Sequence, residues 1–222
     1  PHECLIELPS KLTATGIGRG YCADEAAEET APPRREVRLR APLFDPAERR
    51  LSPAEAGTAH HLFMQFCDFA EAEKPGGVER ELARLAARGI LSEKQAAAVK
   101  IPRIEAFFAS ELYRGLMKNA KVRREFKFSV LVPASRYFPA AESEPEENVL
   151  LQGVIDCLIE TEDGYVILDF KTDRVSEGTL PERAESYRAQ LDAYAAAVRE
   201  ICGGTVQGSI LYFFQTGTIW KM

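Results

Sequence analysis

Several features that would assign a function directly are missing from this sequence of 222 residues. No stretch approaches the roughly 18 consecutive apolar residues that a membrane-spanning helix needs, so we expect no membrane segment. No GxxxxGKS or GxxxxGKT phosphate-binding loop occurs, so we expect any ATP-driven step to lie outside this chain. The five cysteines are scattered without a CxxC pair, which argues against a disulfide framework or a zinc or iron–sulfur site and is typical of a reduced cytoplasmic protein.

An excess of basic residues is missing too. Lys and Arg number 28 against 34 for Asp and Glu, which gives a net charge of −6. This balance argues against a surface that binds nucleic acid all over, but it leaves room for a local basic path. Hydrophobic residues make up 45% of the chain, which excludes wholesale disorder and supplies the core of one large domain or two small ones. Because the sequence begins with proline and not methionine, we expect it to be a piece of a longer protein.

The periodicity of the chain divides it near residue 50. Residues 1–50 are poorly periodic and predict an irregular lead-in or arm. Residues 51–119 show helical spacing, with helix-start signals that begin at two serines, Ser52 and Ser92. Residues 120–222 predict strands, with one helix at 181–199. Helices followed by a hairpin, a helix and a strand predict an α/β or α+β domain.

The first predicted strand spans residues 122–132 and ends at a proline. Its even-numbered positions from Val122 to Val132 are expected to share one face. Beside them lies a basic run that fits either contact with a nucleic-acid backbone or a solvated strand edge: Lys121, Arg123, Arg124 and Lys127. Glu125, within this run, is a supporting candidate for an acidic site residue.

The next two strands carry the most informative side chains. Residues 149–160 and 165–170 are joined by a tight polar turn with an Asp-Gly pair, which is a strong hairpin signal. Asp169 and Lys171 leave the same face of their strand, while the phenylalanine between them turns towards the other side. If the turn holds an even number of residues, Asp156 lies opposite them and joins them on that face.

Two carboxylates and one ammonium in this arrangement predict a divalent-cation site. Carboxylates about 4 Å apart repel by roughly 1–4 kcal/mol at surface-like dielectric constants. Mg²⁺ relieves such repulsion, because it binds one or two carboxylates together with substrate phosphate oxygens. A metal held by Asp156 and Asp169 would polarise a phosphate and activate water, and Lys171 would stabilise the developing charge. The alternative is that Asp169 and Lys171 are ordinary solvent-facing strand residues.

Three short segments resemble a known family of enzymes. Gly153-Val-Ile-Asp156, Asp169-Phe-Lys171 and Gln190-Leu-Asp-Ala-Tyr194 are similar to the motifs of PD-(D/E)xK nucleases of the RecB type. The wider context resembles the C-terminal nuclease domain of AddA-type bacterial helicase–nuclease subunits, densely so over residues 149–214. The resemblance recurs at 52–69 and 121–133.

This resemblance implies the restriction-endonuclease-like PD-(D/E)xK fold, in which a central mixed β-sheet is flanked by helices. The nuclease domain would span residues 51–222. Its N-terminal helical part would be 51–119, and its catalytic sheet 120–222.

The resemblance also implies a role for each matching residue. Asp156 and Asp169 would bind the metal, and Lys171 would be the catalytic lysine. Gln190 and Tyr194 lie four apart on one helix face. They would contact DNA or support the cluster, unless they are only the polar edge of an amphipathic helix.

A histidine is expected to complete the metal site. Gly57-Thr58-Ala59-His60-His61 resembles the GTxxH helix of this family, and counting from Gly57 puts the metal-binding histidine at His61. Because the histidine is doubled, the register is open by one residue. Without the family resemblance, a histidine on a helix among apolar residues is more often a packed core residue or a helix cap than a metal ligand.

Taken as a whole, the resemblance implies a Mg²⁺-dependent DNA exonuclease, with Mn²⁺ able to substitute. It would act in the bacterial cytoplasm within an AddAB/RecBCD-type helicase–nuclease that processes double-strand breaks for recombinational repair. The parent protein would supply the ATP-driven motor that feeds single-stranded DNA ends, and an AddB-like subunit would be its partner. Two alternatives are a stand-alone RecB-like or phage-type nuclease and a catalytically silent DNA-binding scaffold domain.

Overall fold

The structure, a computed structural model, describes residues 9–17, 51–141 and 147–222. Most of the predicted lead-in, residues 1–8 and 18–50, lies outside them. One part of it that is described differs from the prediction, because Lys11–Thr13 forms a β-strand, β1, and so belongs to the sheet of the domain.

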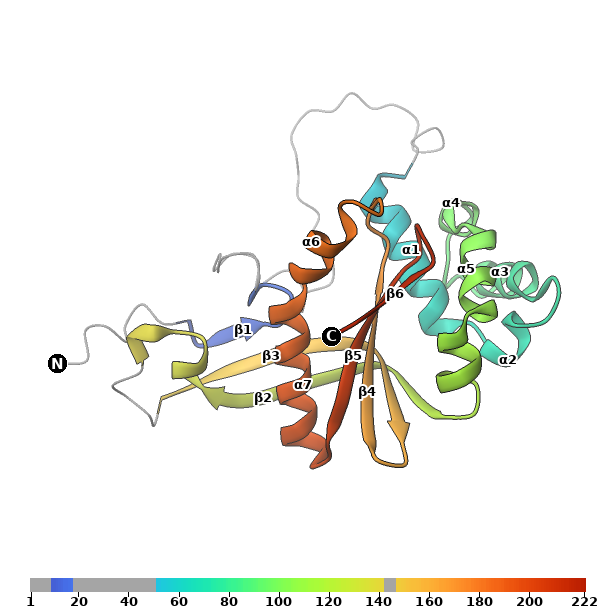
Figure 1. The fold of residues 1–222 in the computed structure, drawn as a ribbon. Coiled ribbons are helices and arrows are strands. Elements are labelled where there is room, and N and C mark those ends of the chain that lie inside the picture. Colours follow the sequence, from blue (N-terminus) through green and yellow to red (C-terminus); the bar gives the residue numbers. More distant parts are fainter. Residues whose placement is uncertain (1–8, 18–50, 142–146) are drawn as a thin grey trace, which may run out of the picture.

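Within the described residues, six strands form one mixed sheet (Figure 1). After β1 the strands are β2 (Lys121–Pro133), β3 (Asn148–Thr161), β4 (Gly164–Lys171), β5 (Val206–Phe213) and β6 (Thr218–Lys221). The β1–β3 and β4–β5 pairs are parallel, and the β2–β3, β3–β4 and β5–β6 pairs are antiparallel. The prediction of a mixed α/β fold is confirmed.

Strand β3 is the centre of this arrangement. β2 pairs with it along almost its whole length, from residue 148 to residue 160. β1 and β4 must therefore share its other edge, where β1 pairs with residues 150–152 and β4 with residues 157–161. Residues 153–156 lie between these two partners. A gap in the ladder thus falls at Gly153–Asp156, the first of the three segments that carry the family resemblance.

Helices precede β2 and connect β4 to β5. The first group comprises α1 (Pro53–Phe66), α2 (Phe69–Ala72), α3 (Gly77–Ala87), α4 (Glu93–Ala98), α5 (Ile101–Ala109) and a π-helical turn at Leu112–Met117. The second comprises α6 (Leu180–Glu185) and α7 (Arg188–Cys202). The helix starts predicted at Ser52 and Ser92 are confirmed, because each serine accepts the backbone N–H of the third helical residue within a full capping box.

One long helix predicted from the sequence is divided in the structure. The helix predicted at 181–199 is two helices, α6 and α7, separated at Ser186 and Tyr187. The Ser186 hydroxyl donates to the Arg183 carbonyl at 2.6 Å. This local bond competes with the regular helical hydrogen bonds, which is the known effect of serine inside a helix.

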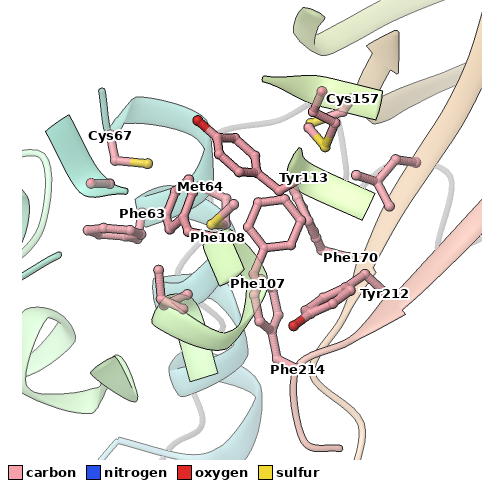
Figure 2. Close-up of a cluster of buried hydrophobic side chains, with 14 of the residues drawn as sticks. Phe63, Met64, Cys67, Phe107, Phe108, Tyr113, Cys157, Phe170, Tyr212 and Phe214 are labelled. Atoms are coloured by element: carbon pink, nitrogen blue, oxygen red, sulfur yellow. The ribbon is translucent and has the colours of Figure 1, made fainter. Parts of the chain in front are cut away.

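Hydrophobic cores cover both faces of the sheet. On one face, aromatic side chains of α1, α5 and the π-helical turn pack with Phe170, Tyr212 and Phe214 (Figure 2). On the other face, α7 packs Leu191 and Tyr194 against the sheet. Phe170 is 2% exposed, as expected for the residue between Asp169 and Lys171.

The prediction that the even-numbered positions of β2 share one face is wrong. Val122 packs against the core of α1–α5, whereas Phe126 and Phe128 pack against the core of α7. The reversal occurs at Glu125, whose φ of 51° lies in the left-handed region that side-chain-bearing residues rarely adopt. β3 reverses at the facing position: Ile155 belongs to the α7 core, and the next odd-numbered residue, Cys157, belongs to the other.

Candidate active site

The β3–β4 hairpin sets the register of the site. Thr161 pairs with Gly164, so the turn contains two residues, the even number on which the predicted register depended. The same register brings Asp156 opposite Asp169. The pairing itself ends at Cys157 and Leu168, and beyond that point the strands separate.

Asp156 bridges the two strands where they separate. Its Oδ2 atom accepts a hydrogen bond of 2.7 Å from the backbone N–H of Phe170. The side chain thus satisfies a β4 donor where the β3–β4 ladder has ended. This contact fixes the carboxylate against the backbone between Asp169 and Lys171.

Asp169 and Lys171 form a buried ion pair on the same face of β4. The Asp169 carboxylate is 4% exposed, and its Oδ2 lies 2.7 Å from Nζ of Lys171. Apart from this ammonium, Oδ2 has no polar partner among the described residues. Burial raises the pKa of Asp169, and the positive charge of Lys171 only partly offsets that effect.

The two histidines of α1 have different surroundings. His60 is buried: Nδ1 lies 2.8 Å from the Ala56 carbonyl, and Nε2 accepts the Lys100 backbone N–H at 3.1 Å. These two contacts suit a neutral ring with its proton on Nδ1, and burial lowers the pKa of His60. His60 therefore joins α1 to the start of α5.

His61 is directed to the carboxylates. Its Nδ1 lies 3.4 Å from Oδ1 of Asp156. Burial by itself would lower the pKa of His61, but the hydrogen bond and charge of Asp156, with the charge of Asp169, raise it above its ordinary value. Of the two histidines, it is His61 that the fold brings to the cluster.

A glycine allows α1 to lie close to the end of β4. A Cβ atom on Gly57 would lie only 2.7 Å from Oγ1 of Thr172, the residue that follows Lys171. The glycine one turn before His61 is therefore required by the spacing between helix and strand.

Gln190 and Tyr194 of α7 complete the surroundings of the lysine. Oε1 of Gln190 lies 3.4 Å from Nζ of Lys171, and Nε2 of Gln190 donates to the Tyr194 hydroxyl at 2.7 Å. The two side chains are 7% and 2% exposed, respectively. This burial favours support of the cluster over direct contact with DNA.

These side chains line one open cleft of about 900 Å³, together with further residues of α1, α5, β4 and α7. Three cations that sequence reasoning did not single out also line it: Lys100, Arg103 and Arg174. None of the three forms an ion pair with a side chain in the described part of the chain. They carry no spacing signal, because α5 and the end of β4 come together only in the fold.

The basic run predicted beside the first strand lies elsewhere. Lys121 and Arg123 both form ion pairs with Glu160. Arg124 donates to the carbonyls of Met64 and Cys67 at 3.0 and 2.6 Å, so its guanidinium caps the end of α1. The prediction of a DNA contact at Arg124 does not fit this capping role, because the guanidinium is engaged by the two carbonyls.

Lys127 and Glu125 lie nearer to the cleft than their positions in the sequence indicate. Lys127, from the basic run, is exposed and pairs through its backbone with Val154, which lines the cleft, so DNA contact there stays a prediction. Glu125 lies opposite Asp156, and burial followed by the charge of Asp156 raises its pKa. Its unusual backbone conformation has no signature in the sequence.

The metal site expected from the sequence is only partly formed. Across residues 9–17, 51–141 and 147–222, no three His, Cys, Asp or Glu side chains come together closely enough to hold a metal. Asp156 is engaged by His61 and the Phe170 backbone, and Asp169 by Lys171. The carboxylate oxygens are nevertheless the donor type of a hard cation, and the buried Oδ2 of Asp169 has no described polar partner other than the Lys171 ammonium.

Comparison with known proteins assigns the family. The family profile of the PD-(D/E)XK nuclease superfamily matches residues 34–219. The chain belongs to this superfamily. The PD-(D/E)XK domain is also similar to bacterial proteins that are named as subunits of an ATP-dependent helicase/nuclease. The one from Desulforudis audaxviator is 37% identical over 221 residues, which are 98% of this chain and 18% of that protein.

Two further relatives with the same name show the same proportions. The protein from Moorella thermoacetica is 37% identical over 225 residues, covering 100% of this chain and 16% of its own. The protein from Pelotomaculum thermopropionicum is 38% identical over 221 residues, which are 98% of this chain and 17% of that protein. The PD-(D/E)XK chain thus spans less than a fifth of these relatives. A crystal structure of SSO0001 aligns with 79% of the chain and 66% of its own at a TM-score of 0.34 and 14% identity.

The described helices of the PD-(D/E)XK domain pack into its two hydrophobic cores. None of the described helices is both long and apolar enough to cross a membrane.

Proposed function

We propose that this chain is the metal-dependent DNA nuclease domain of an AddA-type helicase–nuclease. One observation carries the proposal: Asp156, Asp169 and Lys171 line one cleft, at the point where β3 and β4 separate, and His61 reaches it from α1. Hydrolysis of a phosphodiester needs groups that bind the phosphate, activate water and stabilise negative charge, and this set contains them.

The metal ligands in this proposal are His61, Asp156 and Asp169. The two carboxylates supply the oxygen donors that suit Mg²⁺, with Mn²⁺ able to substitute. The burial of the Asp169 carboxylate supports the assignment, because a cation bound beside the Lys171 ammonium would further stabilise its charge. A cation held there would polarise the scissile phosphate and make the attacking water more acidic.

Neighbouring protein groups hold the Lys171 ammonium and the Asp156 carboxylate in place for the reaction. Lys171 places its ammonium in the cleft and stabilises the charge that grows on the phosphate oxygens. Asp169 and Gln190 hold that ammonium from two sides of the fold, the strand and α7. The Phe170 N–H fixes the Asp156 carboxylate, so its position does not depend on a flexible partner.

Substrate DNA enters along the rim of the cleft. Lys100, Arg103 and Arg174 are cations of this rim without ion-pair partners among the described side chains, so they are available to phosphates. Lys121 and Arg123 are neutralised by Glu160, which makes them weaker candidates. Local charge in the cleft accounts for DNA binding by a chain whose net charge is −6.

The parent protein supplies what this chain lacks. The relatives are named as ATP-dependent helicase/nuclease subunits, and this name supports an ATP-driven motor that feeds single-stranded ends to the nuclease. An AddB-like subunit is the proposed partner, and processing of double-strand breaks for recombinational repair in the bacterial cytoplasm is the proposed role.

Purified chain and a labelled single-stranded DNA test the proposal. Cleavage is expected with Mg²⁺ or Mn²⁺, without ATP, and none with EDTA. Asp169→Asn and Lys171→Ala should each abolish it, while Lys121→Ala, on the strand outside the cleft, should leave it unchanged. Equal cleavage by the wild-type, Asp169→Asn and Lys171→Ala proteins would contradict the assignment.

Calorimetric titration with Mn²⁺ separates a nuclease from a catalytically silent scaffold. Binding that is lost in Asp156→Ala supports the metal site. A wild-type protein that binds DNA but neither binds Mn²⁺ nor cleaves would establish the scaffold alternative.

A further inference from the structure

Lys171 has a third neighbour, Tyr187, to which the sequence analysis assigned no role. Its Nζ lies 3.8 Å from the centre of the Tyr187 ring. Tyr187 is the residue at the break between α6 and α7, where the helix predicted from the sequence is interrupted. An ammonium this close to the face of an aromatic ring is attracted by its quadrupole.

Two further side chains, the acidic Asp173 and the basic Arg183, fix the position of Tyr187. Its hydroxyl donates to Oδ2 of Asp173 at 2.8 Å. Arg183 donates to Oδ1 of the same carboxylate through Nε and Nη2, at 3.0 and 2.6 Å. The Arg183 guanidinium also lies 4.9 Å from the ring centre. The ring is therefore fixed at its hydroxyl end and along one face.

Asp173 links this arrangement back to the strand that carries the lysine. It lies two residues beyond Lys171, so a displacement of the ring would have to move the end of β4 as well. Burial raises the pKa of Tyr187 and so does its bond to Asp173, which keeps the hydroxyl a proton donor. A tyrosine required only for packing would need neither the carboxylate nor the arginine.

A lysine needs such support more than most catalytic groups. Its flexible four-carbon side chain has many rotamers, and holding the ammonium at one place costs rotamer entropy. Asp169 contacts the ammonium from β4 and Gln190 from α7, but the Gln190 contact is long, at 3.4 Å. The ring at the α6–α7 break supplies a broad surface against which the ammonium rests.

We propose that Tyr187, anchored by Asp173 and Arg183, is a positioning residue that holds the Lys171 ammonium in the cleft. The proposal rests on the nuclease function proposed above. Tyr187 acts through the lysine, so it should affect the rate of the chemical step and not the affinity for DNA.

Two substitutions of Tyr187 separate the ring from its hydroxyl. Tyr187→Phe keeps the ring, and Tyr187→Leu removes it while leaving an apolar side chain. With single-stranded DNA and Mg²⁺, we expect Tyr187→Leu to lower kcat at least tenfold with KM unchanged within about twofold. Tyr187→Phe should retain at least a third of wild-type kcat. Equal kcat for the two variants, or a change in KM alone for Tyr187→Leu, would overturn the proposal.

A measurement on the unaltered protein covers the case in which Tyr187→Leu does not fold. In wild-type protein with ¹³C-labelled lysine, the Lys171 side-chain protons should be shifted upfield by the ring current of Tyr187, with Lys171→Arg identifying the signal. A Lys171 signal at the position of exposed lysines would refute the contact. This readout needs no hydrolysis, so it tests the positioning role even if the wild-type protein fails to cleave DNA.

Discussion

The register of β2 and β3 sets Glu125 opposite Asp156 at the one position of β2 that is not paired, where both strands exchange the hydrophobic cores that they face. The ladder continues without a register shift on both sides of this position, from Arg124 with Cys157 to Phe126 with Ile155. The left-handed backbone of Glu125 accommodates the exchange. One consequence is that Asp156, in the middle of a long strand, is free to turn its carboxylate towards β4.

The backbone conformation of Glu125 predicts an unusual ranking of two substitutions. Glu125→Gly and Glu125→Ala both remove the carboxylate, but only glycine adopts a positive φ without strain. We expect the glycine variant to be the more stable of the two by about 0.5–1 kcal/mol, although glycine usually weakens a strand. Urea unfolding of both variants measures the difference. An alanine variant as stable as the glycine variant would show that this position is not strained.

The close approach of Gly57 to Thr172 predicts a loss of activity that a second substitution restores. In Gly57→Ala the new Cβ would meet Oγ1 of Thr172 at 2.7 Å and displace α1, which carries His61. Misplacement by about 1 Å can lower rates by roughly 100-fold, so we expect a fall of tenfold or more in cleavage. Thermal unfolding should change little, because alanine favours a helix by about 1 kcal/mol over glycine.

Thr172→Ala is the matched control for that experiment. It removes Oγ1 and leaves the Cβ atom, which would lie at an ordinary contact distance of 3.7 Å. Cleavage by the double variant should return to the level of Thr172→Ala alone. A double variant as inactive as Gly57→Ala would mean that the glycine is needed for another reason.

A buried carboxylate far from the cleft predicts how stability depends on pH. Glu81 of α3 is 3% exposed; it accepts the Asp68 backbone N–H at 2.6 Å and two bonds from Arg84. The Arg84 bonds are the main cause that lowers the pKa of Glu81 below 4.5. A lowered folded-state pKa stabilises the fold above the unfolded-state pKa, and this stabilisation is lost as pH falls through the folded value.

Glu81→Gln removes this contribution. At neutral pH we expect the substitution to lower the free energy of unfolding by about 2 kcal/mol, the scale of a hydrogen bond to a charged group. Urea unfolding at several pH values should show the difference shrinking as the pH falls below 4.5, the ordinary pKa of glutamate. A difference that is the same at pH 3 and pH 7 would exclude the charge of Glu81 as its source.

The salt dependence of DNA binding identifies the cations that contact phosphates. Each phosphate contact to single-stranded DNA contributes about 0.7 to the slope of log affinity against log salt. Lys100→Gln, Arg103→Gln and Arg174→Gln should each weaken binding and reduce the slope by about that amount, measured by fluorescence anisotropy in EDTA. Lys121→Gln serves as the control, because Glu160 neutralises Lys121. A slope reduced by the control and not by the rim variants would reverse the assignment of the DNA path.

Local signals in the sequence predict those features that local chemistry determines. Capping boxes at Ser52 and Ser92 and the hairpin register near Asp156 depend on residues a few positions apart, so spacing alone reveals them. The reversal at Glu125 depends on a sheet that faces two cores, and no alternation of residue types predicts it. The sequence makes Arg124 look like a surface cation, because its partners, two carbonyls at the end of α1, are far away along the chain.

The cores on both faces of the sheet have a consequence for biosynthesis. His61 comes from a helix of one core, the carboxylates from the sheet, and Gln190 from a helix of the other. Contacts between residues so distant in the chain form late, because the intervening loops must close first. A nascent chain that has not yet released α7 from the ribosome therefore lacks part of the site. Until α7 is released and packs on the sheet, the Lys171 ammonium lacks its contact with Gln190, so the order of synthesis makes this cluster one of the last parts of the fold to be completed.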